Sequence, residues 1–196
     1  MLRRVCVFCG SSQGARPAYG DAATKLGVTL ARRSIELVYG GGNIGLMGVL
    51  ADATLAAGGK VIGVIPESLR RLEVAHEGLS DLRVVHSMHE RKAVMADLSD
   101  GFVALPGGLG TFEELLEIMT WSQLGIHNKP VGLLDVAGYF DALVALLQHA
   151  VAEKFLRIEH YRQLLVATEP DALVEQLAAY RPPLSDVAKW IDRDQR

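Results

Sequence analysis

Short runs of Val, Ile and Leu alternate with longer segments of helical periodicity along almost the whole chain, and this alternation constrains the fold more than any other feature. Several of the runs are apolar throughout, which is typical of parallel strands that are covered on both faces. Strands are expected at Arg4–Cys9, Glu36–Tyr39, Lys60–Ile65, Leu82–His86, Gly101–Leu105, Val131–Leu134 and Leu164–Ala167.

The segments between these runs place apolar residues on one side of a helix. In the first of them, Tyr19, Ala23, Leu26 and Leu30 share a face. Helices are expected at Pro17–Arg33, Asn43–Ala57, Met88–Leu98, Phe112–Leu124, Tyr139–Glu153 and Pro170–Tyr180. The alternation of strand and helix predicts an α/β fold with a doubly wound, mostly parallel sheet of Rossmann-like architecture.

One domain is expected over residues 1–196, because no linker, repeat or low-complexity tract divides the chain. The short polar segment from residue 182 to 196 is expected to form a C-terminal tail, either as a small helix or as a frayed end. No apolar run approaches the roughly 20 residues of a membrane span. The apolar start breaks at Gly10, too early for a secretory signal. A cytoplasmic protein with no membrane partner is therefore expected.

The charge balance argues against a surface that binds nucleic acid. The formal net charge is -3 and the pI is near 6.1, whereas such a surface usually needs a basic excess. A small phosphorylated ligand remains compatible with this balance, because it needs only a local positive site.

Neither cysteines nor histidines indicate a metal or redox centre. Cys6 and Cys9 are three residues apart in an expected strand, so their side chains are expected to point to opposite faces as core thiols. His86, His89 and Glu90 have neither the H-E-x-x-H spacing nor an evident further ligand. We therefore expect no metal and no cofactor.

Three glycine-bearing loops follow expected strands: Gly10-Ser11-Ser12, Gly40 to Gly48, and Pro106 to Thr111. The carboxyl ends of parallel strands meet at one edge of the sheet, where ligands bind in such folds. Glycine lets a ligand approach the backbone closely, and the free N–H groups of a following helix suit a phosphate. We therefore expect these loops to bind a phosphorylated ligand.

The second loop also contains a G-x-G-x-x-G pattern at Gly40, Gly42 and Gly45, with Glu67 about 20 residues beyond, as in a dinucleotide fingerprint. The fingerprint normally occupies the first strand-to-helix turn, whereas this loop is the second, and Glu67 follows Pro66 past the strand. Close packing of helix on strand explains at least part of this loop. An NAD(P)-dependent oxidoreductase is kept as a less favoured alternative.

The third loop leads directly into Thr111-Phe112-Glu113-Glu114. Thr111 and Glu114 have the spacing of a capping box, in which the glutamate would have only a structural role. The same helix start is expected to face the ligand edge of the sheet, so a catalytic role for Glu114 is the competing interpretation. A capping box alone does not require the preceding glycines.

An arginine is expected to point inward from the segment Met88 to Met95. Met88 and Met95 are seven residues apart, and Arg91 lies between them on the same helical stripe. An inward guanidinium needs a partner, because an unpaired buried charge is costly. The partner is either a core carboxylate, an anionic ligand or a catalytic glutamate.

These motifs together resemble the signature of the Lonely Guy family, the cytokinin riboside 5'-monophosphate phosphoribohydrolases, whose members have also carried the name lysine decarboxylase. The resemblance rests on Met88-His89-Glu90-Arg91-Lys92 and on Pro106 to Glu114. It extends over nearly the whole chain, including Gly40 to Gly48 and Thr120 to His127. It implies a Rossmann-like homodimer that binds a nucleoside monophosphate without a dinucleotide.

The resemblance also implies roles for individual residues. Arg91 and Glu114 match the family's catalytic pair. The expected substrate-binding residues are Gly10, Ser11, Gly41, Gly42, Glu73, Lys92, Gly107, Gly108, Leu109, Gly110, Thr111, Glu113 and Thr120. The implied reaction is hydrolysis of the N-glycosidic bond, giving a free base and ribose 5-phosphate. Arg91 would either hold Glu114 ionised and in place or assist the leaving base, and both alternatives stay open here.

Two further functions compete with hydrolysis. A non-catalytic nucleotide or cofactor carrier on the same fold would bind without turnover. A lysine decarboxylase is the weakest alternative, because it needs a pyridoxal phosphate lysine with a supporting shell, and no lysine here lies in a recognisable setting for one.

Overall fold

The structure is a computed structural model that describes residues 2–70 and 75–182. Most of the expected C-terminal tail therefore lies outside the described residues, as does Glu73. The strands are β1 (Arg4–Phe8), β2 (Glu36–Tyr39), β3 (Val61–Pro66), β4 (Asp81–Val85), β5 (Gly101–Ala104), β6 (Val131–Leu134) and β7 (Leu164–Ala167). The helices are α1 (Pro17–Arg32), α2 (Gly45–Ala56), α3 (Glu67–Arg70), α4 (Met88–Leu98), α5 (Leu109–Gln123), α6 (Asp141–Ala152), α7 (Ile158–Tyr161) and α8 (Pro170–Ala179).

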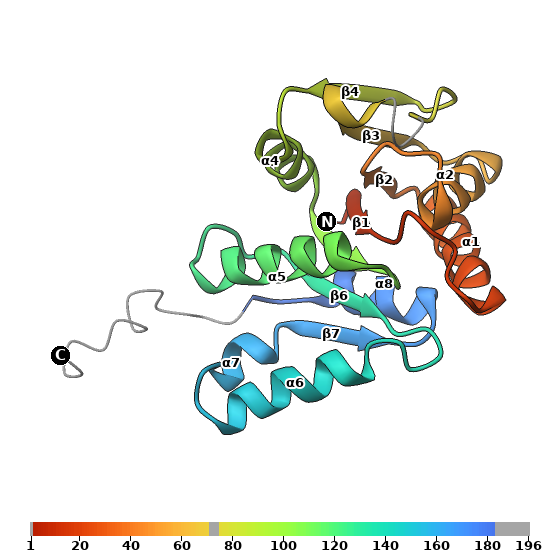
Figure 1. Ribbon diagram of the computed structural model, residues 1–196. Coiled ribbons are helices and arrows are strands. Elements are labelled where there is room, and N and C mark those ends of the chain that lie inside the picture. The colour runs from red at the N-terminus through yellow and green to blue at the C-terminus, as the bar shows by residue number, and fades with distance from the viewer. Residues whose placement is uncertain (1, 71–74, 183–196) are drawn as a thin grey trace.

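The strands form one parallel sheet in the order β4-β3-β2-β1-β5-β6-β7 (Figure 1). Val5 of the central strand pairs with Leu37 on one side and with Gly101 on the other. The chain thus builds outward from β1 in one direction and then from β5 in the other. This arrangement confirms the expected doubly wound α/β fold and places its switch point between β1 and β5.

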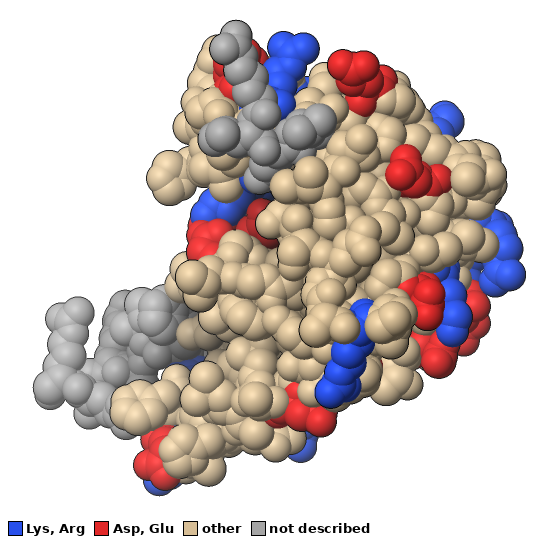
Figure 2. Space-filling view, turned by 45° about the vertical axis from the view of Figure 1, so that its right-hand side comes forward, with Lys and Arg blue, Asp and Glu red and all other residues tan. Residues whose placement is uncertain are grey.

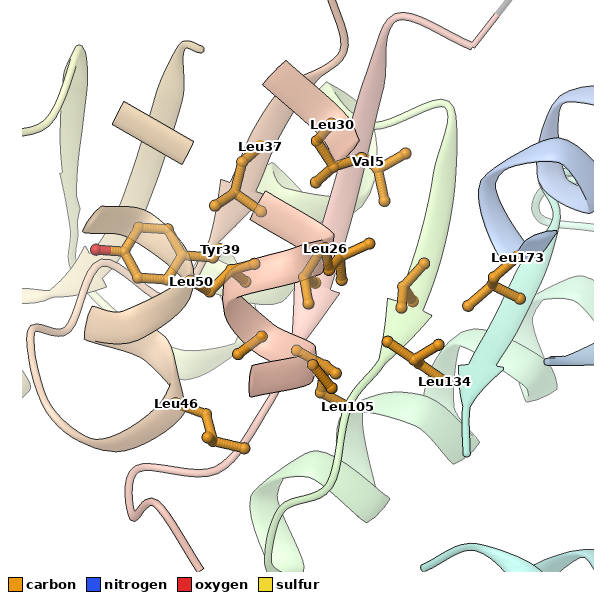
Figure 3. Close-up of a cluster of buried hydrophobic side chains, with 14 of the residues drawn as sticks. Val5, Leu26, Leu30, Leu37, Tyr39, Leu46, Leu50, Leu105, Leu134 and Leu173 are labelled. Carbon is orange, nitrogen blue, oxygen red and sulfur yellow. The ribbon is translucent and has the colours of Figure 1, made fainter. Parts of the chain in front are cut away.

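Helices cover both faces of the sheet because alternate strand residues point to opposite sides. Val5, Leu37 and Leu105 pack with α1, α2 and α8 in one apolar cluster (Figure 3). Phe8, Val38 and Phe102 pack with α4, α5 and α6 in the other. The two cysteines follow the same rule, since Cys6 belongs to the second cluster and Cys9 packs against the first; both are free thiols.

The expected strands agree with the structure to within one residue at each end. The expected helices agree to within two residues, except that α5 begins three residues earlier than predicted, at Leu109. Two short helices, α3 and α7, were not predicted. Four residues make little more than one helical turn, so such segments show no periodicity in the sequence and depend on their surroundings.

Charged side chains of both signs are dispersed over the face shown in Figure 2, and much of that face is formed by other residues. No helix in the described part of the chain is both long enough and apolar enough to span a membrane.

Candidate active site

A cavity of about 270 Å³ lies at the switch point, beyond the carboxyl ends of β1 and β5. The wall combines glycine-loop backbone with apolar and ionisable side chains. Its lining residues are Cys9, Gly10, Ser11, Met47, Leu69, Met88, Arg91, Gly108, Leu109, Gly110, Thr111, Glu113 and Glu114. Other hollows are as large, such as one of about 310 Å³ lined by Arg3, Glu36 and Asp100 at the opposite edge of the sheet. Position and chemistry, rather than size, therefore single out the cavity at the switch point.

The three glycine loops meet beside this cavity through backbone contacts. The Leu46 N–H donates to the Gly10 carbonyl at 3.0 Å, and the Gly10 N–H donates to the Pro106 carbonyl at 3.0 Å. A Cβ atom at Gly107 would lie 2.8 Å from the Gly10 nitrogen and 2.1 Å from the Thr111 Oγ1 atom. Gly107 is therefore required for contact between protein loops rather than for room beside a ligand.

The start of α5 corrects the expected capping box. The helix begins at Leu109, with Gly108 as its N-cap residue and no side chain capping it. Thr111 is consequently the third helical residue, buried and unable to act as the cap. The prediction was wrong because Gly108 takes the cap position in an extended conformation, and the sequence spacing of Thr111 and Glu114 does not reveal this. Glu114 therefore lies beyond the position that a capping glutamate would occupy.

The first turn of α5 has the properties of an anion site. The N–H groups of Leu109, Gly110 and Thr111 have no hydrogen-bond acceptor, backbone or side chain, among the described residues. Such free amides, together with the helix dipole, favour a negative group. A Cβ atom added at Gly108 or Gly110 would meet nothing within 4 Å, so the space beside both residues is open.

Arg91 points inward as predicted, and only 5% of its surface is exposed. Its Nε donates to the Val64 carbonyl at 3.0 Å, and its Nη2 donates to the Gly40 carbonyl at 2.9 Å. The expected inward stripe is only partly observed, because Met95 is buried whereas Met88 is 41% exposed at the cavity. A carbonyl within β3 and the carbonyl directly after β2 thus hold the guanidinium at the cavity wall.

Arg91 and Glu114 line the same cavity from different helices. Their charges also reach one common neighbour, the Cys6 thiol. Burial raises the pKa of Cys6 well above its ordinary value, the Glu114 charge raises it further, and the Arg91 charge lowers it. Burial and the Glu114 charge likewise raise the pKa of Cys9, which lines the cavity. Both thiols are therefore kept neutral and are poor nucleophiles.

Lys92 connects α4 to α5 beside the cavity instead of lining it. The lysine is buried, and its Nζ donates to the Glu113 carboxylate at 2.5 Å and to the Glu117 carboxylate at 3.0 Å. Burial by itself lowers the pKa of Lys92, but the hydrogen bonds and charges of both glutamates raise it above its ordinary value. The lysine is accordingly held as an ammonium group.

The structure does not bring every expected substrate-binding residue to the cavity. The Gly41 carbonyl accepts the His76 N–H at 3.0 Å and Gly42 forms a β-bridge with Ala75, so both contact other backbone. The Thr120 hydroxyl donates to the carbonyl of Leu116, four residues earlier in α5. Of the expected residues, Gly10, Ser11, Gly108, Leu109, Gly110, Thr111 and Glu113 do line the cavity.

Several residues of the site were not found by sequence reasoning. Met47 and Leu69 add apolar wall to the cavity, and nothing in the local pattern distinguishes them from core residues. Ser87 and Glu90 form a capping arrangement that the sequence does signal. The Ser87 hydroxyl accepts the Glu90 N–H, and the Glu90 carboxylate accepts the His86 N–H. This arrangement fixes the start of α4, the helix that carries Arg91.

Two sequence-based alternatives can be compared with this geometry. A Cβ atom at Gly40 would lie 2.1 Å from Nη2 of Arg91, so the first glycine of the G-x-G-x-x-G pattern makes room for a guanidinium. A packing role therefore accounts for that residue without a dinucleotide. Among the residues described, no three His, Cys, Asp or Glu side chains converge as metal ligands.

Comparisons with known proteins agree with the resemblance found in the motifs. The family model described as possible lysine decarboxylase matches residues 47–177. The probable cytokinin riboside 5'-monophosphate phosphoribohydrolase LOGL9 of Oryza sativa subsp. japonica is 54% identical over 181 residues, covering 92% of this chain and 80% of that protein. The cytokinin riboside 5'-monophosphate phosphoribohydrolase LOG7 of Arabidopsis thaliana is 47% identical over 194 residues, covering 99% and 89% respectively.

Solved structures share the architecture at much lower identity. The molybdenum cofactor carrier protein of Chlamydomonas reinhardtii has a TM-score of 0.70 at 22% identity, covering 92% of this chain and 100% of that one. The molybdenum cofactor binding protein of Rippkaea orientalis has a TM-score of 0.69 at 22% identity, covering 91% and 97%. These two likenesses concern the fold alone. By sequence, the chain belongs to the family of the cytokinin riboside 5'-monophosphate phosphoribohydrolases, and it also matches the family model described as possible lysine decarboxylase.

Proposed function

We propose that this protein hydrolyses the N-glycosidic bond of a nucleoside 5'-monophosphate, releasing a free base and ribose 5-phosphate. The observation that carries the proposal is that Arg91 and Glu114 line one cavity together with the uncapped start of α5. Relatives with about half of their residues identical carry the name of this activity on cytokinin riboside 5'-monophosphates. AMP and its N6-prenylated derivatives are therefore the substrates to test.

The 5'-phosphate is assigned to the first turn of α5. The free amides and the open space at Gly108 and Gly110 fit a phosphate group. Thr111 lines the same part of the cavity and can add a hydroxyl donor. Binding energy from this remote group would position the sugar, which explains a preference for monophosphates over nucleosides.

Glu114 is assigned to the anomeric carbon. Glycosidic cleavage develops positive charge on the sugar, and a carboxylate beside that charge stabilises it and orients or deprotonates water. The same helix thus carries the anion site at its first turn and the acidic group five residues beyond Leu109. A sugar phosphate can span this short distance.

Arg91 is assigned to one of two tasks beside Glu114. Its hydrogen bonds to the Val64 and Gly40 carbonyls leave a fixed positive charge at the cavity wall. That charge either keeps Glu114 ionised and in place or stabilises the leaving base. Activity of an Arg91→Gln variant across pH separates these tasks, since only under the first does loss of the charge shift the acidic limb of the profile to higher pH.

The geometry does not favour lysine decarboxylation. A lysine that forms a Schiff base has to become a neutral amine. Lys92 is the one buried lysine in the described part of the chain, and two glutamates hold it charged. No observation specifically favours a non-catalytic carrier, because the likeness to carrier proteins concerns the fold alone.

A homodimer in the cytoplasm is also proposed. Two exposed apolar side chains line the cavity, Leu109 at 86% and Met88 at 41% exposure. Exposed apolar groups that lie together indicate a surface for another protein. Light scattering of the purified protein should give twice the mass of 21.2 kDa, and a monomeric mass at micromolar concentration would exclude this assembly.

The proposed reaction is tested by incubating the purified protein with AMP and with isopentenyladenosine monophosphate and separating the products. Free base and ribose 5-phosphate should appear in equal amounts. Glu114→Gln should lower kcat by about 10²- to 10⁴-fold, the usual contribution of a catalytic acid or base, with an unchanged melting temperature. Glu153→Gln, an exposed residue at the end of α6, is the matched control. Equal activity of the two variants would remove Glu114 from the mechanism.

A further inference from the structure

We propose that Tyr139 is a positioning residue that sets the orientation of the phosphate-binding loop before α5. Tyr139 lies between β6 and α6, and its hydroxyl donates a hydrogen bond to the Gly107 carbonyl. It is not among the residues that line the cavity. The proposal rests on the proposed function only in that the loop is taken to bind the 5'-phosphate.

The hydroxyl of Tyr139 is held in place because the ring of Tyr139 packs against three other aromatic rings. The ring is stacked on Phe112 of α5, with centroids 6.4 Å apart, and it makes edge contacts with Tyr19 of α1 at 5.7 Å and with Phe140 at 5.1 Å. Such ring contacts add a geometric preference to the burial of the rings. The donor therefore has little freedom to follow the loop if the loop moves.

The bond to Gly107 determines where the next amide points. In a trans peptide the carbonyl of one residue and the N–H of the next point in opposite directions, and the described chain contains no cis peptide. Because the Gly107 carbonyl points at Tyr139, the Gly108 N–H points away from Tyr139. Gly108 itself lines the cavity, whereas Tyr139 does not. The hydroxyl thus favours the orientation in which the Gly108 N–H faces the cavity side.

This control is needed because the peptide joins two glycines. Glycine accepts conformations that other residues avoid, so a Gly-Gly peptide can rotate with little steric cost. The Gly107 side is restrained by the close approach of Thr111 and Gly10, but Gly108 has nothing within 4 Å of a Cβ position. The hydrogen bond from Tyr139 restrains this peptide from outside the loop. Without it, the Gly108 N–H has to be reoriented when phosphate binds.

The experiment compares Tyr139→Phe with a control, Tyr161→Phe. The control also removes a tyrosine hydroxyl, one that accepts a hydrogen bond from Gln148 away from the cavity. Affinities for AMP, adenosine and inorganic phosphate are measured by calorimetry with full-length proteins that also carry Glu114→Gln, so that AMP is not hydrolysed during the titration. Tyr139→Phe keeps the ring and its packing, so its melting temperature should stay close to that of the wild type. Loss of this one hydrogen bond should lower the affinities for AMP and for inorganic phosphate by a similar factor, up to about tenfold. Adenosine affinity should not change.

Kinetics give a second readout that a merely structural role would not reproduce. For Tyr139→Phe, KM for the monophosphate should rise while kcat changes little. Unchanged AMP affinity, or equal losses for AMP and adenosine, would overturn the proposal. A wild-type protein that binds AMP without cleaving it would remove the proposed function, and the calorimetric comparison would still decide the role of Tyr139.

Discussion

Replacing Gly40 with alanine should displace the Arg91 guanidinium while leaving the backbone of the sheet in place. The added Cβ atom would lie 2.1 Å from Nη2 and 3.2 Å from Cζ of Arg91. An ordinary contact needs at least about 3.5 Å, so the guanidinium has to retreat by more than 1 Å. The clashing atoms are at the end of a flexible side chain, and this is why the arginine rather than the backbone is expected to move.

The expected loss of stability follows from the two hydrogen bonds that hold the guanidinium, at 2.9 and 3.0 Å. A hydrogen bond to a charged group contributes about 1.5–3 kcal/mol. The open cavity lets water replace part of this interaction, so the lower end applies, about 3 kcal/mol for both bonds. In a domain of this size that corresponds to a melting temperature lower by about 6–12 °C.

A double-mutant cycle isolates this effect from other consequences of the new methyl group. The free energies of unfolding of the wild type, Gly40→Ala, Arg91→Met and the double variant are measured in denaturant. Without a guanidinium, Gly40→Ala should cost less than about 1 kcal/mol, because the remaining neighbour, the Met47 sulfur, lies at an ordinary 3.5 Å. The coupling between the two positions should therefore be about 2 kcal/mol.

Activity supplies an independent check on the same variant. Gly40→Ala should lose most of its turnover of nucleoside monophosphate, because the charge beside Glu114 has moved. Additive stability effects of the two substitutions would show that Gly40 does not make room for Arg91. Full activity with a displaced arginine would show that the position of the guanidinium does not matter for the reaction.

Two further outcomes can be checked with single variants. In thermal scans, Gly107→Ala should have a lower melting temperature because the new Cβ atom clashes with the Gly10 backbone. Gly108→Ala should fold normally, and calorimetry should show weaker binding of phosphate. The reverse ranking would contradict the assignment of the open space beside Gly108 to the phosphate. Lys92→Met should be less stable than the wild type below pH 10.5, and the difference should shrink at higher pH. The pKa of Lys92 is raised in the folded state, so its contribution is complete below the ordinary value and is lost as the ammonium deprotonates; an unchanged difference in unfolding free energy between pH 8 and 11.5 would contradict this.

Much of the site could be predicted because its residues lie next to recognisable elements. Gly10 and Gly108 lie in loops that follow strands, and Arg91 and Glu114 lie in the first two turns of the helices α4 and α5. Parallel strands bring such positions to one edge of the sheet. The start of α5 was predicted three residues late. The pattern of Thr111 and Glu114 is compatible with two helix starts, and the conformation of Gly108 decides between them.

The sequence by itself determined the order of strands and helices, the parallel sheet and the edge at which the loops gather, since these depend on local periodicity and on short connections. Only the tertiary structure decided the partners of the side chains. Arg91 is bound by carbonyls 27 and 51 positions away, Lys92 by glutamates 21 and 25 positions away, and Gly107 by a tyrosine 32 positions away. Such contacts follow from which strands are neighbours and how the helices pack on them. Local propensity carries no information on contacts between residues so far apart in the sequence. The partners of the site residues are therefore fixed only when the sheet is assembled.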